Sequence, residues 1–273
     1  MNPALPVLFS LTLFLSAALL FTLELMIARM ILPLFGGTPA VWNTCMMFFQ
    51  AVLLAGYGYA HLLGTRAGTA RQIAVHLTLL AAASIVLPVA VPRQWAPSPE
   101  GNPVVELLGL LLITVGPPFF VLSAIAPLLQ RWFARTGHPA AGDPYFLYSA
   151  SNLGSMLALI GYPAWVEPHL RLAGQGRAWT AGYVAVLALT LLCAAVLWRC
   201  RPACPPGERA EGEGAAGPCD APAPLGRREQ GRWVLLAFVP SSLLLGVTSF
   251  LSTDVAAIPL FWVVPLALYL LSF

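Results

Sequence analysis

Eight apolar runs, each close to twenty residues or longer, divide this sequence and constrain its fold more than any other feature. They cover roughly residues 7–32, 40–63, 72–91, 104–130, 144–166, 178–198, 233–251 and 255–273. A helix needs about 20 apolar residues to cross a membrane, because the hydrocarbon layer is about 30 Å thick and a helix rises about 1.5 Å per residue. A helix also satisfies its own backbone hydrogen bonds inside lipid. The sequence therefore predicts an all-α fold, a polytopic transmembrane bundle of about eight helices.

The composition excludes several classes of protein. Hydrophobic residues make up 59% of the 273 residues and charged residues only 9%, whereas a soluble domain carries about 25% charged residues. A soluble enzyme, a disordered chain and a nucleic-acid binder are therefore excluded. No phosphate-binding loop, nucleophile elbow or HExxH motif occurs, and no His pair has metal-ligand spacing. We predict no catalytic residues, no metal and no cofactor, and no enzymatic activity for this chain alone.

A polar segment at residues 199–232 separates the first six runs from the last two. It holds six Arg, five acidic residues, six Pro and six Gly, and such a composition cannot bury an apolar core. We predict a disordered cytoplasmic linker there, between a six-helix bundle at 1–198 and two further helices at 233–273. The last run is still apolar at Phe273, so we expect a second bundle that is cut short, as in a fragment of a longer protein.

Arginine is distributed unevenly between the two predicted sides of the membrane. With the N-terminus inside, the cytoplasmic segments hold Arg66, Arg71, Arg131, Arg135 and the six Arg of 199–232, which makes ten, against four outside. Cytoplasmic segments of membrane proteins carry an excess of Lys and Arg. The sequence therefore predicts a multi-pass protein with a cytoplasmic N-terminus.

Two charged residues, Glu24 and Arg29, lie within the first apolar run. Each charge costs about 2.5–3.5 kcal/mol in the middle of a spanning helix, so each is expected to have a partner on another helix, or Arg29 extends its side chain to the outer interface. The five-residue spacing offsets the two by about 140° around a helix, so they do not face each other. They are either a proton- or substrate-coupling pair in a central cavity or a structural polar lock. For Glu24 the candidate partners are Arg29, Asn152 and Tyr148.

The fifth run carries a polar stripe on one helix face and a small-residue face for close packing. The stripe consists of Tyr145, Tyr148, Asn152 and Ser155, and the small face of Ala150, Gly154 and Ala158. Such a helix belongs inside a bundle, where the stripe either lines a cavity or forms hydrogen bonds to a neighbouring helix.

Two further features lie in other runs. Pro117 and Pro118 predict a kink in the fourth run. Asp254 either caps the eighth helix or lines a substrate path.

Three long segments carry a resemblance to a known family. They read FTLELMIARMILPLFGGTPAVWNTCMMFFQAVLLAGYGYAH, DPYFLYSASNLGSMLALIGYPAWVEPHL and PSSLLLGVTSFLSTDVAAIPLFWVVPLALYLLSF. They resemble the membrane region of bacterial fused transporter/spermidine synthase-like proteins, in which a major-facilitator-like region precedes a synthase-like soluble domain. The resemblance implies a place in the bacterial inner membrane. It extends only to the membrane half, since the glycine-rich nucleotide loop of the aminopropyltransferase is absent.

Two functions are compatible with these features. The first is a transporter-like membrane domain for a polyamine or a related small cation, with Glu24, Arg29, Tyr148, Asn152 and Asp254 as the substrate or coupling residues, because an amine favours carboxylates and aromatic faces. The alternative is a non-transporting anchor or scaffold. The expected partners are the lipid bilayer and a synthase-like domain or protein, but no nucleic acid.

Overall fold

The computed structural model describes residues 4–91, 101–199, 226–250 and 263–271, and all regular structure in these residues is helical. The first bundle contains α1 (Ala4–Phe35), α2 (Pro39–Arg66), α3 (Thr69–Ala83), α4 (Pro103–Thr114), α5 (Gly116–Ser123), α6 (Ile125–Phe133), α7 (Phe146–Gly161), α8 (Glu167–His169) and α9 (Leu172–Arg199). The remaining helices are α10 (Arg227–Phe250) and α11 (Val263–Leu271). The prediction of a helical bundle is thus confirmed.

Within the described residues, five helical segments are long and apolar enough to cross a membrane. They are Ala4–Phe35, Pro39–Arg66, Thr69–Val86, Leu172–Arg199 and Arg228–Thr248, and a bent segment over α4, α5 and α6 would make a sixth. The fifth predicted run forms α-helix over only 16 residues before it changes to a π-helical turn at Tyr162–Val166. Only nine residues of the last run are described in α11. A total of eight spans therefore stays a prediction.

The predicted kink of the fourth run is confirmed. The chain bends by 63° between Pro103–Thr114 and Gly116–Phe133, at Val115, whose backbone angles leave the helical region. Pro117 and Pro118 follow at the start of α5. Proline lacks a backbone N–H group, and its ring clashes with the preceding turn of a helix. Helix α4 therefore ends before these two residues.

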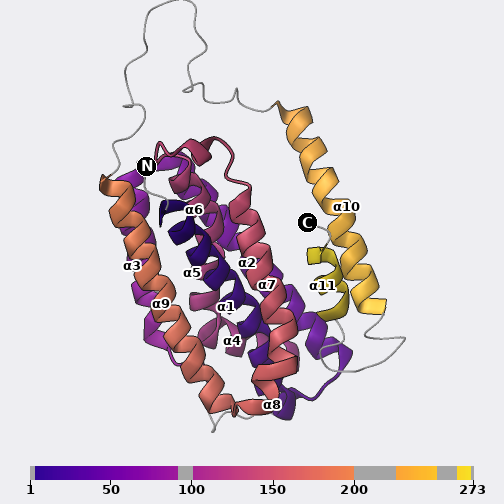
Figure 1. Cartoon of the computed structure of the whole chain (residues 1–273). Helices are drawn as coiled ribbons and strands as arrows, with labels where there is room; N and C mark the ends of the chain where they lie inside the picture. The colour runs from indigo at the N-terminus through magenta and orange to yellow at the C-terminus, as the bar shows by residue number, and fades with distance from the viewer. Residues whose placement is uncertain (1–3, 92–100, 200–225, 251–262, 272–273) are drawn as a thin grey trace, which may run out of the picture.

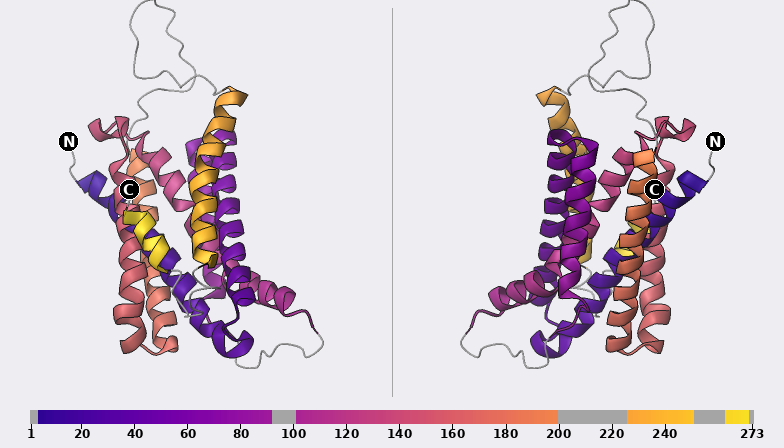
Figure 2. Two further views of the ribbon diagram at one scale, coloured as in Figure 1. Left: turned by 90° about the vertical axis from the view of Figure 1, so that its right-hand side faces the viewer. Right: turned by 90° about the vertical axis from the view of Figure 1, so that its left-hand side faces the viewer.

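Helix α1 lies in the middle of the first bundle and packs most closely against α7 and α9. Figure 2 shows α1 crossing obliquely between one wall that contains α2 and α10 and another that contains α7 and α9. The small face predicted for the fifth run makes the α1–α7 contact possible. Gly154 and Ala158 on α7 are buried, and Gly154 faces the backbone of Phe14 directly.

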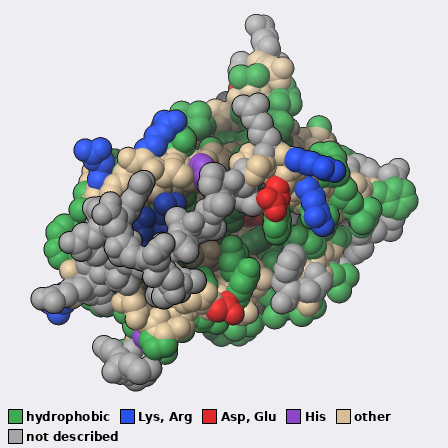
Figure 3. Space-filling model, turned by 90° about the horizontal axis from the view of Figure 1, so that it is seen from above, with side chains coloured by type: hydrophobic (Ala, Val, Ile, Leu, Met, Phe, Trp, Pro, Cys, Tyr) green, Lys and Arg blue, Asp and Glu red, His purple; other side chains and the backbone are tan. Residues whose placement is uncertain are grey.

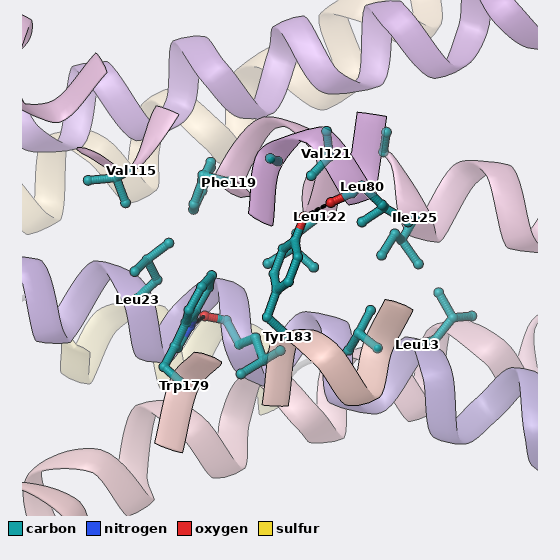
Figure 4. Packing of buried hydrophobic residues seen from close by; sticks show 14 of the residues in the cluster. Leu13, Leu23, Leu80, Val115, Phe119, Val121, Leu122, Ile125, Trp179 and Tyr183 are labelled. Carbon is teal, nitrogen blue, oxygen red and sulfur yellow. Dashed lines mark hydrogen bonds between the residues drawn. The ribbon is translucent and has the colours of Figure 1, made fainter. Parts of the chain in front are cut away.

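Helix α9 is fixed to two neighbours by buried hydrogen bonds one helical turn apart. The indole N–H of Trp179 donates to the carbonyl of Leu19 on α1 (2.9 Å), and the hydroxyl of Tyr183 donates to that of Leu80 on α3 (2.8 Å). Around them lies the apolar core, to which α1, α5, α6 and α9 contribute Leu13, Leu23, Phe119 and Ile125 among others (Figure 4). The two bonds satisfy polar groups that would be costly to bury unpaired.

The two ends of the bundle differ in charge. One end, at the top of Figure 1, holds the α2–α3 turn, the end of α6, the end of α9 and the start of α10, and we call it the basic end. The Arg residues with described side chains there are Arg66, Arg71, Arg131, Arg135, Arg199, Arg228 and Arg232. Figure 3 shows Arg side chains distributed around this end. The opposite end holds the turn after α1, and α8. Because helix ends and helix starts share the basic end, successive helical segments alternate in direction, as expected of a multi-pass bundle.

The predicted linker overlaps a helix at its C-terminal end. Helix α10 begins at Arg227, six residues before the predicted start at 233, while residues 200–225 lie outside the described part. The extra turn contains exposed Arg228, Glu229 and Gln230. Hydropathy follows only the apolar part of a helix, so it misses a polar first turn. Beyond this turn, most described side chains of α10 are exposed, and the helix packs against α11.

Candidate functional site

A cavity of about 110 Å³ lies between the first bundle and the two helices that follow it. Its walls come from four helices: Glu24 and Ala28 of α1; Trp42, Cys45, Met46, Phe49, Gln50 and Leu53 of α2; Leu244, Leu245 and Thr248 of α10; and Leu266 of α11. One ordered water needs about 10–15 Å³ of such space. The cavity therefore has room for several waters or for a small molecule.

Glu24 contributes the one carboxylate among the described residues that line this cavity. The side chain lies on the same face of α1 as Ala28, four residues later, while Leu23, Leu25, Met26 and Ile27 around it are buried in the core. Within the described residues Glu24 makes no hydrogen bond and no ion pair, so the expected contact with Arg29, Asn152 or Tyr148 is not formed there. The carboxylate is thus directed to the cavity and not to a neighbouring side chain.

Arg29 faces a different neighbour. Its Nη1 lies 2.7 Å from Oε1 of Glu167 on α8, and the two side chains are 39% and 27% exposed. The angular offset of the two α1 charges explains why they separate, because Arg29 points toward the α8 end of the bundle while Glu24 faces α2. The partner predicted for Arg29 on another helix exists, and it is Glu167.

The polar stripe of α7 does not reach the cavity. Tyr148 is 51% exposed, and its ring centroid lies 6.1 Å from that of Tyr145. Asn152 is half-buried, and the hydroxyl of Ser155 donates to the carbonyl of Ser151 in its own helix. The small face of α7 packs on α1, so the stripe is directed elsewhere. Asp254 lies outside the described residues.

The α2 side of the cavity is not among the site residues predicted from the sequence. Gln50 is a polar residue inside the second apolar run, and Asn43 precedes it by seven residues, so both lie on one helix face. Asn43 and Gln50 also line a second groove with Leu245 of α10. This spacing could have marked the face. Trp42 lines the cavity as well, and its N–H donates to the carbonyl of Gly37 (3.3 Å).

The cavity combines one carboxylate, one indole ring and a few neutral polar groups on apolar walls. A carboxylate and an aromatic face both attract a cation, and the apolar walls suit an alkyl body. In the described part of the chain, no three His, Cys, Asp or Glu side chains gather closely enough to hold a metal ion. The arrangement therefore suits a small organic cation or a proton on Glu24 better than a bound metal.

Comparison with known proteins adds no relative to this picture. Neither the protein-family models, nor the curated proteins, nor the solved structures gave a match. The geometry of the cavity and the residues around it are therefore the basis for a function.

Proposed function

We propose that this chain is a transporter-like membrane domain that binds a small organic cation, a polyamine or a related amine, in the cavity beside Glu24. The observation that carries the proposal is the position of this carboxylate at the junction between the first bundle and α10 and α11. Many transporters bind substrate where two bundles or repeats meet. A carboxylate inside a membrane protein is also expected to serve a substrate or proton path.

The lining gives each part of an amine a partner. The ammonium group is attracted by Glu24 and by the face of Trp42, the amide of Gln50 accepts a hydrogen bond from it, and the alkyl part contacts Phe49 and Leu53. Each further ammonium of a polyamine needs an anionic or aromatic partner of its own. Since Glu24 is the one carboxylate in the described lining, we expect monoamines to bind as well as spermidine does.

The membrane setting of this proposal includes an orientation. We propose that the chain resides in the inner membrane of a bacterium, with the N-terminus and the basic end in the cytoplasm. The excess of Arg at the basic end supports this orientation. The major-facilitator-like resemblance remains part of the same proposal, because six helical segments followed by further membrane helices fit a transporter with two bundles.

Binding to purified protein tests the proposal. Spermidine and a monoamine such as butylamine are titrated against the full chain in detergent, with the thermal unfolding midpoint as the readout. Wild-type protein should be stabilised by both amines, and Glu24→Gln should remove the stabilisation without lowering the midpoint of the ligand-free protein. Glu229→Gln on α10 removes the same charge far from the cavity and should bind amines as the wild type does.

Uptake into proteoliposomes then separates transport from anchoring. A transporter-like domain should accumulate labelled amine in a Glu24-dependent way. A wild-type protein that shows neither amine binding nor uptake would contradict the proposal and leave the non-transporting anchor.

A further inference from the structure

A separate hollow of about 590 Å³ lies on the outside of α2, at the basic end and away from the Glu24 cavity. It is an open groove lined by Ala55, Gly58, Tyr59, Leu62, Leu63, Arg66, Ala67 and Arg71. Ala55, Tyr59, Leu62 and Arg66 repeat every three or four residues, so they form one face of α2. None of the lining residues comes from α10 or α11.

The groove changes from apolar to basic along its length. Ala55, Gly58 and Leu62 line the part within the span, and Arg66 and Arg71 line the part at the α2–α3 turn. From Ala55 to Arg66 the helix rises about 16 Å, close to the depth of one leaflet of the hydrocarbon layer, about 15 Å. An apolar slot one leaflet deep with positive charge at its surface end matches the shape of a phospholipid.

The two arginines are available to an anion. Both are exposed, and within the described residues neither guanidinium makes a hydrogen bond or an ion pair. Guanidinium groups bind phosphate oxygens in a bidentate way. Two such groups beside one slot therefore form a recognition site for a phosphate.

Further positive charge surrounds the turn. Arg131 lies against Gly64 of α2, and Arg135 donates to the hydroxyl of Thr69 at the start of α3. Burial, and then the neighbouring Arg131, lower the pKa of Arg135. Loss of solvation and the nearby positive charge both disfavour the charged guanidinium there, and a bound anion would favour it.

We infer that the groove on α2 binds an anionic phospholipid, with the phosphate between Arg66 and Arg71 and one acyl chain along Ala55, Gly58 and Leu62. Anionic lipids are held at basic pockets on the cytoplasmic side of membrane helices by this combination of charge and apolar contact. The slot is open beside Gly58, since a Cβ placed there would meet no atom within 4 Å. The site is separate from the Glu24 cavity and does not depend on amine binding there, while its place on the cytoplasmic side rests on the proposed orientation.

Native mass spectrometry of the full chain, released from detergent with added lipid, tests this site. Palmitoyl-oleoyl phosphatidylglycerol should remain bound at lower lipid concentration than palmitoyl-oleoyl phosphatidylcholine. The double variant Arg66→Gln/Arg71→Gln should weaken phosphatidylglycerol retention by at least about tenfold, since each basic residue near an anionic surface contributes about 1 kcal/mol. Arg228→Gln/Arg232→Gln removes the same charge from the same end and should retain the lipid as the wild type does.

A second variant tests the acyl slot separately from the charge. Gly58→Leu adds a side chain in the groove, where its Cβ meets no atom within 4 Å, and it leaves both arginines in place, so it should also reduce phosphatidylglycerol retention. Glycerol 3-phosphate, which has the phosphate but no acyl chain, should not compete. Equal retention of the two lipids, or equal loss in the two double-arginine variants, would overturn the inference. Two further results would also overturn the inference. Competition by glycerol 3-phosphate would show that the groove is a site for free phosphate. Conversion of a dimer to a monomer by Gly58→Leu would show that a second copy of the chain occupies the groove.

Discussion

Gly154 on α7 lies directly against the backbone carbonyl of Phe14 on α1, so close that no side chain fits between the two helices there. This contact sets the separation of the pair that packs most closely in the first bundle. Small residues allow such approach in membrane proteins, where van der Waals packing replaces much of the hydrophobic driving force between helices.

Gly154→Ala should therefore destabilise the protein, by about 1–3 kcal/mol, because the added methyl group forces α1 and α7 apart. Thermal unfolding in detergent, followed by the loss of monodisperse protein, measures the change. Gly161→Ala, at the end of the same helix, is the matched control, since a Cβ there meets no atom within 4 Å. The control should be at least as stable as the wild type. Equal losses of stability in the two variants would contradict the role of Gly154 in the contact between α1 and α7.

The ion pair between Arg29 and Glu167 should contribute a measurable coupling energy. Both side chains are partly exposed, so we expect about 1 kcal/mol. A double-mutant cycle with Arg29→Met, Glu167→Gln and the combined variant measures it through unfolding midpoints. If the two single effects simply add, the pair observed at the α8 end has no energetic role.

Gln72 and His76 lie one turn apart on α3, are both buried, and differ in hydrogen bonding. The side chain of Gln72 accepts from the Trp132 indole (3.1 Å) and donates to the carbonyl of Ala67 (2.7 Å). Both ring nitrogens of His76 have no hydrogen-bond partner among the described residues.

Gln72→Leu should lower the free energy of unfolding by about 1–3 kcal/mol, since the Trp132 N–H then has no acceptor. His76→Leu should leave it unchanged or raise it, because the substitution removes two unpaired polar atoms from a buried place. Unfolding of the two variants, compared side by side in one detergent, gives the answer. A larger loss of unfolding free energy for His76→Leu than for Gln72→Leu would show that the His76 ring has a hydrogen-bond partner.

Tyr183→Phe should destabilise the protein by about 0.5–1.5 kcal/mol, because the Leu80 carbonyl loses a buried hydrogen bond. Tyr145→Phe removes the same hydroxyl from a side chain that is 73% exposed, and it should have no effect. Circular dichroism at increasing temperature distinguishes the two. Identical thermal unfolding curves for the two variants would contradict a stabilising role for the Tyr183 hydrogen bond between α9 and α3.

The proposed orientation predicts which loops face the cell exterior. In a background where Cys200, Cys204 and Cys219 are replaced by Ser, an impermeant maleimide added to intact cells should label Ala173→Cys and not Gly68→Cys. Both positions are exposed at opposite ends of the bundle. Gly68→Cys should react once the cells are permeabilised, and labelling of Gly68→Cys in intact cells would reverse the orientation.

Local signals in the sequence account for much of the fold. The apolar runs mark the helices because a membrane helix must be apolar over its length, and Pro117 marks the break because its ring is incompatible with a continuing helix. Gly154 marks the α1–α7 contact for a similar steric reason. The start of α10 at Arg227 cannot be located from hydropathy, because its first turn is helical but polar.

Contacts between distant positions of the chain are not contained in such signals. Glu24 and Arg29 are recognisable as unusual from their energetic cost in lipid, but periodicity cannot show that Glu167 pairs with Arg29 or that Trp42 and Gln50 lie beside Glu24. The polar stripe with Tyr148 and Asn152 is evident on α7, yet its distance from the cavity depends on how α7 rotates to pack Gly154 on α1. Packing decides these pairings, and both the Arg29–Glu167 pair and the α1–α7 contact join helices far apart in sequence.

The distribution of the apolar core along the chain also sets an order of assembly. The buried hydrophobic members of the described core lie between Leu5 and Leu197, whereas α10 leaves most of its described side chains exposed. A chain is synthesised from its N-terminus, and its domains fold as they emerge. The first bundle can therefore close before α10 leaves the ribosome, and the Glu24 cavity, which needs Leu244 and Thr248, is completed only by the later arrival of that helix.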